Sequence, residues 1–254
     1  MTRAGTLRLA RAATVMLLLA GLAACQPAAR SPKPEPPLVE EPRETVVLIH
    51  GLWRGTGSMW LLAERLEDAG FNVVRVGFDT LGATPKDIVA EVGGQIDACC
   101  TALPRPVHLV GHSMGGLAIR AYLAERRLDG LGRVVQIGSP NAGTPIVDEY
   151  RDAWWMGIAG PTARALGTGE DSFPASLPPP DYPVGIIAGM RTGTFRIDLI
   201  EGQDDGLVPV ESTKVPGMTD FIVVETGHAM MRYNEDVAMQ TIAFLRHGRF
   251  LHEP

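Results

Sequence analysis

Ser113 stands at the centre of Gly-His-Ser-Met-Gly (residues 111–115), directly after the apolar run 107–110. A helical pattern of apolar residues follows at once, so the serine falls at a predicted strand-to-helix turn. Glycine on each side permits a tight crossing of the chain, and a helix N-terminus behind the hydroxyl favours developing negative charge. The pattern predicts a nucleophilic serine.

A serine hydroxyl needs a general base to become a nucleophile at neutral pH. His228 follows the apolar run 221–224, at the expected carboxyl end of a strand, where parallel sheets present catalytic groups. It is therefore the predicted base among the six histidines. Of the others, His108 is expected inside a strand and His112 in the serine turn, pointing away from Ser113. His247 and His252 are expected in a polar tail, and His50 in the first strand–helix loop.

The base in turn needs an acid, which lies between serine and histidine when the chain order Ser…Asp…His holds. The segment 202–210 offers two adjacent candidates, Asp204 and Asp205. Asp79 and Asp198 are weaker candidates and are expected to be solvated loop carboxylates.

Two backbone N–H groups are needed for a developing oxyanion. One is predicted at Met114, the residue after the nucleophile. The other is predicted in the loop after the first strand, where residues 46–49 run into His50-Gly51-Leu52-Trp53. The His50 ring is expected to brace this loop. Trp53 and Trp60 are candidates for lining the acyl site, with core packing as the alternative.

Together these residues resemble the lipase/esterase branch of the α/β-hydrolase superfamily, over residues 45–248. The resemblance implies Asp205 as the acid, because the family's acid stands just before glycine in Asp-Gly-Leu-Val-Pro, and the N–H of Leu52 as the second donor. It implies carboxylic-ester hydrolysis through an acyl-enzyme, with no metal and no organic cofactor. Thioester or amide hydrolysis, or acyl transfer, would use the same triad. A non-catalytic binding lipoprotein with this fold is a further alternative.

Apolar runs alternate with helical patterns along the chain, which predicts an α/β fold with a mostly parallel central sheet of about six strands. The runs are continuous, as expected for strands buried on both faces. Strands are predicted at 46–49, 73–76, 107–110, 134–137, 184–188 and 221–224. Helices are predicted at 58–69, 85–99, 115–127 and 230–246.

Residues 141–183 interrupt this alternation and are too long for a simple connection. They are predicted to form a small cap or lid insertion at the carboxyl edge of the sheet. Trp154 and Trp155 in this segment are candidates for lining the substrate site, with packing against the core as the alternative.

The N-terminus has the pattern of a bacterial export signal. Three arginines precede an apolar segment, residues 12–24, that is too short to span a bilayer permanently. The following Leu22-Ala23-Ala24-Cys25 resembles a lipobox, so residues 1–24 are predicted as a lipoprotein signal peptide and Cys25 as the lipidated residue. An ordinary signal peptide is the alternative. Residues 25–44 are Pro-rich and predict an extended tether, which leaves 45–254 as the hydrolase domain.

Composition limits the remaining possibilities. The chain has 254 residues, of which 45% are hydrophobic, enough for one substantial core. Its net charge is −6 and it has no basic run, so nucleic acid is not an expected partner. The expected partners are an ester substrate and, through the lipid anchor, a membrane of the bacterial cell envelope. Cys99 and Cys100 are predicted as two buried thiols, with a strained disulfide as the alternative.

Overall fold

The computed structural model describes residues 42–101, 103, 106–192 and 199–252. The predicted signal peptide, the lipidation site Cys25, the tether as far as residue 41 and Asp198 lie outside the described residues. The first strand, β1 (Thr45–Ile49), begins at the predicted start of the folded domain. None of the described helices is long and apolar enough to cross a lipid bilayer.

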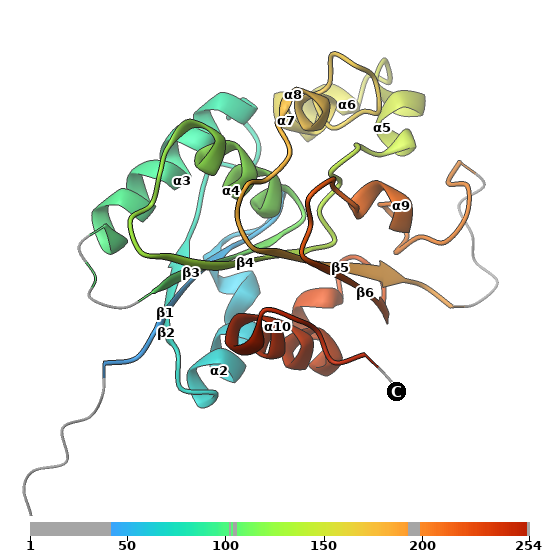
Figure 1. Cartoon of the computed structure of the whole chain (residues 1–254). Helices are drawn as coiled ribbons and strands as arrows, with labels where there is room; N and C mark the ends of the chain where they lie inside the picture. Colours follow the sequence, from blue (N-terminus) through green and yellow to red (C-terminus); the bar gives the residue numbers. More distant parts are fainter. Residues whose placement is uncertain (1–41, 102, 104–105, 193–198, 253–254) are drawn as a thin grey trace, which may run out of the picture. The chain divides into compact units, whose positions relative to one another are not determined.

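Six parallel strands form one sheet in the order β2-β1-β3-β4-β5-β6 (Figure 1). The strands after β1 are β2 (Asn72–Val76), β3 (Val107–His112), β4 (Leu131–Ile137), β5 (Val184–Met190) and β6 (Asp220–Glu225). The predicted parallel sheet of about six strands is confirmed. Because all strands run the same way, the loops that follow β1, β3, β5 and β6 emerge at one edge.

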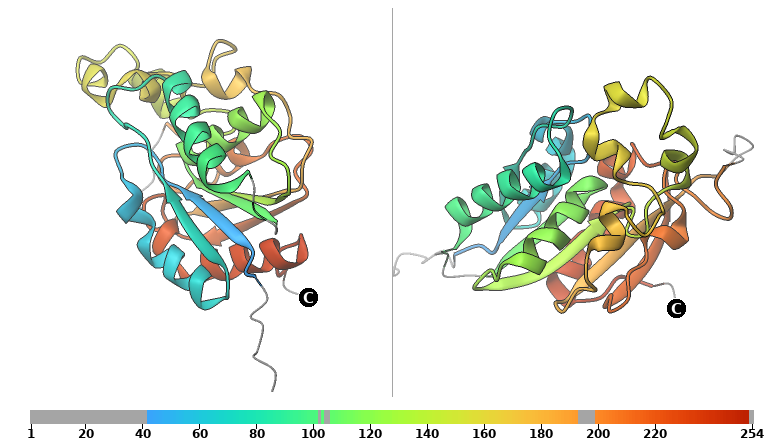
Figure 2. Two further views of the ribbon diagram at one scale, coloured as in Figure 1. Left: turned by 90° about the vertical axis from the view of Figure 1, so that its left-hand side faces the viewer. Right: turned by 90° about the horizontal axis from the view of Figure 1, so that it is seen from above.

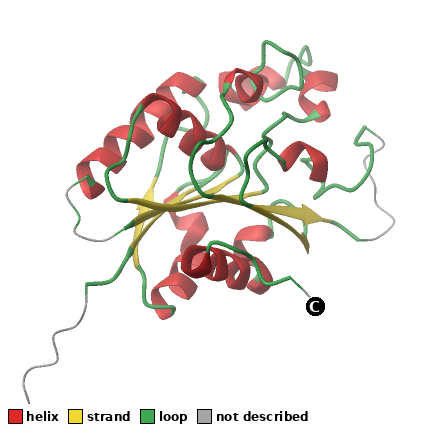
Figure 3. Ribbon diagram, viewed as in Figure 1, coloured by secondary structure: helices red, strands yellow, loops and turns green. Residues whose placement is uncertain are grey.

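Helices cover both faces of the sheet (Figures 1 and 3). One face is covered by α3 (Pro85–Cys100) and α4 (Met114–Glu125). The other is covered by α2 (Trp60–Asp68) and α10 (Glu235–His247). A short 3-10 turn, η1 (Thr56–Met59), leads into α2.

The first strand shows why its sequence is continuously apolar. Val47 and Ile49 join the core cluster that contains α3 and α4. Val46 and Leu48 join the cluster that contains α2 and α10. Successive side chains of a strand point to opposite faces, so a strand covered on both sides buries every residue.

The predicted helix 230–246 is divided in two. A 3-10 turn, η2 (Met231–Tyr233), comes first, and α10 begins after Asn234. The Asn234 side chain accepts a hydrogen bond from the backbone N–H of Val237, at 3.0 Å. Such a cap starts a new helix, and the apolar periodicity that runs through the segment did not reveal it.

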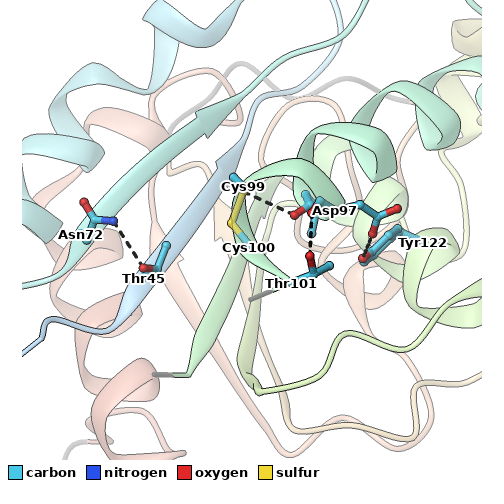
Figure 4. The surroundings of a disulfide bond; sticks show 8 residues. Thr45, Asn72, Asp97, Cys99, Cys100, Thr101 and Tyr122 are labelled. Carbon is cyan, nitrogen blue, oxygen red and sulfur yellow. Dashed lines mark hydrogen bonds between the residues drawn. A yellow bond between two sulfur atoms is a disulfide. The ribbon is translucent and has the colours of Figure 1, made fainter. Parts of the chain in front are cut away.

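The last two residues of α3 are joined by a disulfide, Cys99–Cys100 (Figure 4). The prediction of two free thiols is therefore wrong. Both cysteines lie in the final turn of α3, where carbonyl groups have no partner within the helix and the backbone is less constrained than in a helix interior. Cys100 is buried in the core cluster that α3 shares with α4, and Cys99 packs against that cluster.

Four short helices occupy the predicted cap segment between β4 and β5. They are α5 (Pro145–Tyr150), α6 (Met156–Ala159), α7 (Pro161–Arg164) and α8 (Phe173–Ser176). Figures 1 and 2 show them grouped together, on the same side of the sheet as α4. A further short helix, α9 (Val210–Thr213), follows the loop that carries Asp204 and Asp205.

Candidate active site

Ser113 lies between β3 and α4 in a backbone conformation that side-chain-bearing residues rarely adopt, with φ 55° and ψ −123°. Close backbone packing enforces the turn. A Cβ on Gly111 would lie 2.4 Å from the nitrogen of Gly116, and a Cβ on Gly115 would lie 2.4 Å from the carbonyl oxygen of Ile49. Glycine is therefore required at both positions, as the sequence pattern indicated.

Ser113, His228 and Asp205 form a continuous hydrogen-bonded chain. The Ser113 Oγ lies 3.0 Å from His228 Nε2, and His228 Nδ1 lies 2.7 Å from Asp205 Oδ2. The carboxylate accepts the Nδ1–H, which leaves Nε2 unprotonated and facing the serine hydroxyl. His228 can therefore accept the Ser113 proton.

The loop between β5 and α9 orients Asp205 but not Asp204. Asp205 Oδ1 accepts hydrogen bonds from the N–H groups of Leu207 and Val208, at 3.0 and 2.8 Å, which turns Oδ2 toward His228. The Asp204 carboxylate instead accepts the N–H of Gly206 at 2.7 Å, within its own turn. Of the two candidate acids, only Asp205 reaches the histidine.

The two predicted oxyanion donors flank the serine. A Cβ on Gly51 would lie 2.9 Å from Ser113 Cβ, so the loop after β1 packs directly against the turn that carries Ser113. The backbone N–H of Leu52, next in that loop, and the N–H of Met114 donate no hydrogen bond to any described residue. Both groups are thus available to an oxygen placed beside Ser113.

These residues open onto a cavity of about 460 Å³. The loop after β1, the cap segment, the β5–α9 loop and the loop after β6 each contribute to its walls. The apolar lining residues are Leu52, Trp53, Pro140, Val147, Ala163, Leu166, Leu207, Val208, Ala229 and Met230. Three arginines also line it, Arg54, Arg191 and Arg232. A largely apolar cleft with a few converging polar groups is typical of a small-molecule site.

Comparison with known proteins agrees with this geometry. The sequence profile of the alpha/beta hydrolase family matches residues 46–240, which include β1 from its second residue, the other five strands and the Ser–His–Asp chain. The chain belongs to the alpha/beta hydrolase family. The chain therefore has a hydrolase fold, and esterases and lipases are among the proteins that it resembles.

Individual relatives are distant. A pimeloyl-[acyl-carrier protein] methyl ester esterase from Methylococcus capsulatus is 27% identical, over 82% of this chain and 93% of the relative. The mature form of a Bacillus licheniformis lipase has the same fold, with a TM-score of 0.68 at 20% identity, covering 82% of this chain and 94% of the lipase. A candidate thioesterase from a Silicibacter species gives a TM-score of 0.55 at 17% identity, covering 80% and 75%.

The tryptophans of this alpha/beta hydrolase are not all where the sequence predicted. Trp53 lines the cavity and donates its Nε1–H to the carbonyl oxygen of Ala159 in the cap, at 3.0 Å. Trp154 and Trp155 are not among the lining residues: Trp154 is 82% exposed, and Trp155 packs beside Tyr150. Trp60 is half-exposed on α2 and also does not line the cavity. Adjacent tryptophans in a long insertion gave no signal of which way each would face.

His112 also differs from its prediction. It does not turn away from the site but lines the cavity, with its ring centroid 4.9 Å from that of His228. Its Nε2–H donates to the backbone carbonyl oxygen of His228 at 3.0 Å, so it holds the loop that carries the base. Burial holds the pKa of His112 well below its ordinary value, so the ring is neutral at pH 7. The sequence offered no signal for this contact between residues 116 positions apart.

His50 and His108 are buried elsewhere. His50 stacks on Phe78 with ring centroids 4.5 Å apart, in the loop that leads to Leu52, as expected of a bracing residue. His108 accepts the N–H of Arg133 at Nδ1 and lies 3.3 Å from a Glu44 oxygen at Nε2. Burial lowers the pKa of both rings.

Proposed function

We propose that this chain is a serine hydrolase that cleaves carboxylic esters through an acyl-enzyme. The observation that carries the proposal is the continuous hydrogen-bonded chain from Ser113 through His228 to Asp205 at the wall of an apolar cavity. A hydroxyl with such a base and an oriented acid is the arrangement used for acyl transfer on several unrelated folds.

In the first half-reaction, Ser113 Oγ forms a bond to the ester carbonyl carbon as its proton passes to His228 Nε2. Asp205 stabilises the resulting imidazolium, and the N–H groups of Leu52 and Met114 receive the oxyanion. The tetrahedral species then expels the alcohol, which takes the proton from His228. In the second half-reaction, water gives a proton to His228 and attacks the acyl-enzyme, which releases the acid and restores Ser113.

Two measurements test this proposal. A fluorophosphonate probe is expected to label the wild type and a Ser176→Ala control, in which an exposed serine outside the cavity is removed, but not Ser113→Ala. Hydrolysis of p-nitrophenyl butyrate is expected to fall by on the order of 10³-fold or more in Ser113→Ala alone. Labelling of Ser113→Ala, or activity above roughly a tenth of wild type, would refute the assignment.

Ester chemistry can be separated from thioester chemistry with one acyl group. The same triad can attack either bond, so we compare p-nitrophenyl butyrate with S-butyryl-N-acetylcysteamine. The proposal expects the larger kcat/KM, relative to each compound's uncatalysed rate, for the oxygen ester. The reverse order would make the protein a thioesterase.

We also propose that the protein is exported and lipid-anchored at Cys25. The support is the sequence Leu22-Ala23-Ala24-Cys25 after a short apolar segment. Radiolabelled palmitate should tag the wild type and not Cys25→Ser. Equal labelling of both would contradict the anchor.

A further inference from the structure

One cavity-lining arginine is buried without a hydrogen-bond acceptor among the described residues. Arg232, in η2, is only 8% exposed and lines the cavity that holds Ser113. Among the described residues its guanidinium has no hydrogen-bond acceptor and no ion-pair partner, and its Nε is fully buried, whereas the two terminal nitrogens are not. The ring of Tyr233 lies 4.6 Å from the guanidinium carbon, but a ring against one face leaves the N–H groups in the guanidinium plane unused.

Arg120 shows how the same protein treats a buried arginine with a structural role. It is buried to the same degree, at 5% exposed. Its guanidinium nevertheless donates to the backbone carbonyl groups of Leu177, Pro178 and Asn141 and to the Asn141 side chain. A buried charge without such acceptors is costly, so the bare guanidinium of Arg232 points to an acceptor that binds in the cavity.

A second arginine lines the same cavity. Arg54, in the loop after β1, is exposed, and its one hydrogen bond among the described residues is donated to the neighbouring Trp53 carbonyl. After burial and His228, the charges of Arg232 and Arg54 are the next causes that lower the pKa of His112. The charges of both cations thus act on His112, which lines the same cavity; Arg54 comes from the loop after β1 and Arg232 from η2.

Among the described residues, the cavity lining has no free negative charge to balance them. Asp205 is the one described acidic residue that lines the cavity, and its two oxygens are already bound by His228 and by two backbone N–H groups. Arg191 lines the cavity where it packs over Gly206 and Gly227, and it is not part of this pair. The cap contributes apolar residues to the cavity lining, among them Val147, Ala163 and Leu166.

We propose that Arg232 and Arg54 form an anion-binding subsite beside Ser113, and that the substrates are esters bearing a carboxylate or phosphate group. Guanidinium groups bind both anions through paired, charge-assisted hydrogen bonds. The apolar part of the substrate lies against the cap, and the anion lies within a few atoms of the scissile carbonyl. This inference rests on the proposed esterase function and specifies its substrate class.

Matched pairs of esters test the subsite and locate the anion. In the acyl arm, monomethyl glutarate is compared with methyl valerate, which has a methyl group in place of the carboxylate. In the alcohol arm, the phosphate monoester of 2-hydroxyethyl butyrate is compared with 2-hydroxyethyl butyrate itself. Proton release at constant pH follows all four. We expect kcat/KM of at least one anionic ester to exceed that of its neutral partner roughly tenfold, because a charge-assisted hydrogen bond contributes about that much. Added salt should reduce this difference in kcat/KM.

Variants assign the preference to the two arginines. The ratio of anionic to neutral kcat/KM should fall about tenfold in Arg232→Gln and severalfold in Arg54→Gln. It should stay at the wild-type value in Arg75→Gln, a matched exposed arginine on β2 outside the cavity. Arg232→Lys keeps the charge and should retain most of the preference. If Arg232→Gln does not fold, Arg54→Gln decides the matter.

The two proposals fail in different ways. Hydrolysis of the neutral esters as fast as, or faster than, both anionic partners overturns the anion subsite and leaves the esterase proposal standing. An anionic preference that is unchanged in Arg54→Gln and, where it folds, in Arg232→Gln also overturns the subsite. Absence of hydrolysis of all four esters, together with absence of fluorophosphonate labelling, overturns both proposals.

Discussion

The catalytic edge of the sheet and the cap segment 141–183 are held in place by different kinds of contact. At the edge, backbone packs on backbone: Gly111 and Gly115 leave no room for a side chain, and backbone N–H groups orient Asp205. Side-chain hydrogen bonds to carbonyl groups, such as Trp53 to Ala159 and Thr162 to Ala83, help to tie the cap to the rest of the domain, beside a close backbone approach of Gly160 to Leu81. Its surface exposes Trp154 and Ile158.

This difference separates two tasks. Catalytic groups need positions fixed to a fraction of an ångström, which close backbone packing at a sheet edge provides. The cap supplies only one wall of the cavity, and short helices on a few anchors are sufficient for that. Changes at the edge should therefore alter the chemistry, whereas changes in the cap should alter stability and substrate preference.

The largest expected effect is at the edge, at adjacent aspartates. Asp205→Asn removes the charge that stabilises the His228 imidazolium and can reverse the His228 tautomer, so we expect kcat to fall by on the order of 10³-fold or more. Asp204→Asn, the matched control one residue away, faces its own turn and should stay within about threefold of wild type. Steady-state kinetics on one ester decides between them. Comparable losses in the two variants would contradict the assigned acid.

The next effect concerns the attachment of the cap. Arg120 on α4 binds Asn141 at the start of the cap segment and Leu177 and Pro178 near its end. Arg120→Met leaves these buried acceptors without a donor, so the free energy of unfolding should fall by about 2–4 kcal/mol. Urea unfolding measures it, with the exposed Arg127→Met as control. An unchanged midpoint would mean that the cap is held by other contacts.

The two regions also differed in how far the sequence predicted them. The nucleophile turn, the β1 loop and the Asp-Gly-Leu-Val-Pro loop are local patterns, because each places a functional residue through the backbone geometry of its immediate neighbours. Ser113 and His228 were therefore predictable from their local patterns, whereas the choice of Asp205 over Asp204 came from the resemblance to the α/β-hydrolases. The parallel sheet was predictable for the same reason, since burial on both faces leaves continuous apolar runs.

The residues that were not predicted depend on contacts between distant segments. Whether Trp154 faces the cavity is decided by how α6 packs, and no pattern within residues 141–183 encodes that. The contact from His112 to the His228 loop joins residues that meet only in the folded sheet edge. The bare guanidinium of Arg232 is likewise visible only once its surroundings are known.

A fall in pH should destabilise the sheet and its loops, which carry the buried histidines, rather than the cap, because residues 141–183 contain no histidine. Burial lowers the pKa of His50, His108 and His112 below the ordinary value of 6.5. Below that pH the unfolded chain binds protons that the folded chain does not. The free energy of unfolding therefore has its full value above about pH 6.5 and decreases as the pH falls. Each such proton adds about 1.4 kcal/mol per pH unit to the slope.

The slope can be assigned to one ring. We measure the free energy of unfolding in urea between pH 7.5 and pH 5, a range of about 2.5 units that spans the ordinary histidine pKa. We expect it to fall less steeply with decreasing pH in His112→Gln than in the wild type. His247→Gln, at an exposed position on α10, should keep the wild-type slope. Equal slopes in all three proteins would show that His112 does not resist protonation in the fold.

The smallest expected effect compares two cap residues that differ in exposure. Leu166 is 7% exposed and lines the cavity, whereas Trp154 is 82% exposed and does not. Each acyl methylene buried against the cap is worth about 0.8 kcal/mol, so kcat/KM should rise roughly fourfold per methylene from acetate until the cavity is filled. Leu166→Ala widens the apolar wall and should flatten that rise, while Trp154→Ala should leave the chain-length profile unchanged. A series of p-nitrophenyl esters measures both profiles. If Trp154→Ala flattened the profile and Leu166→Ala did not, the acyl chain would follow the outer surface of the cap rather than the cavity beside Ser113.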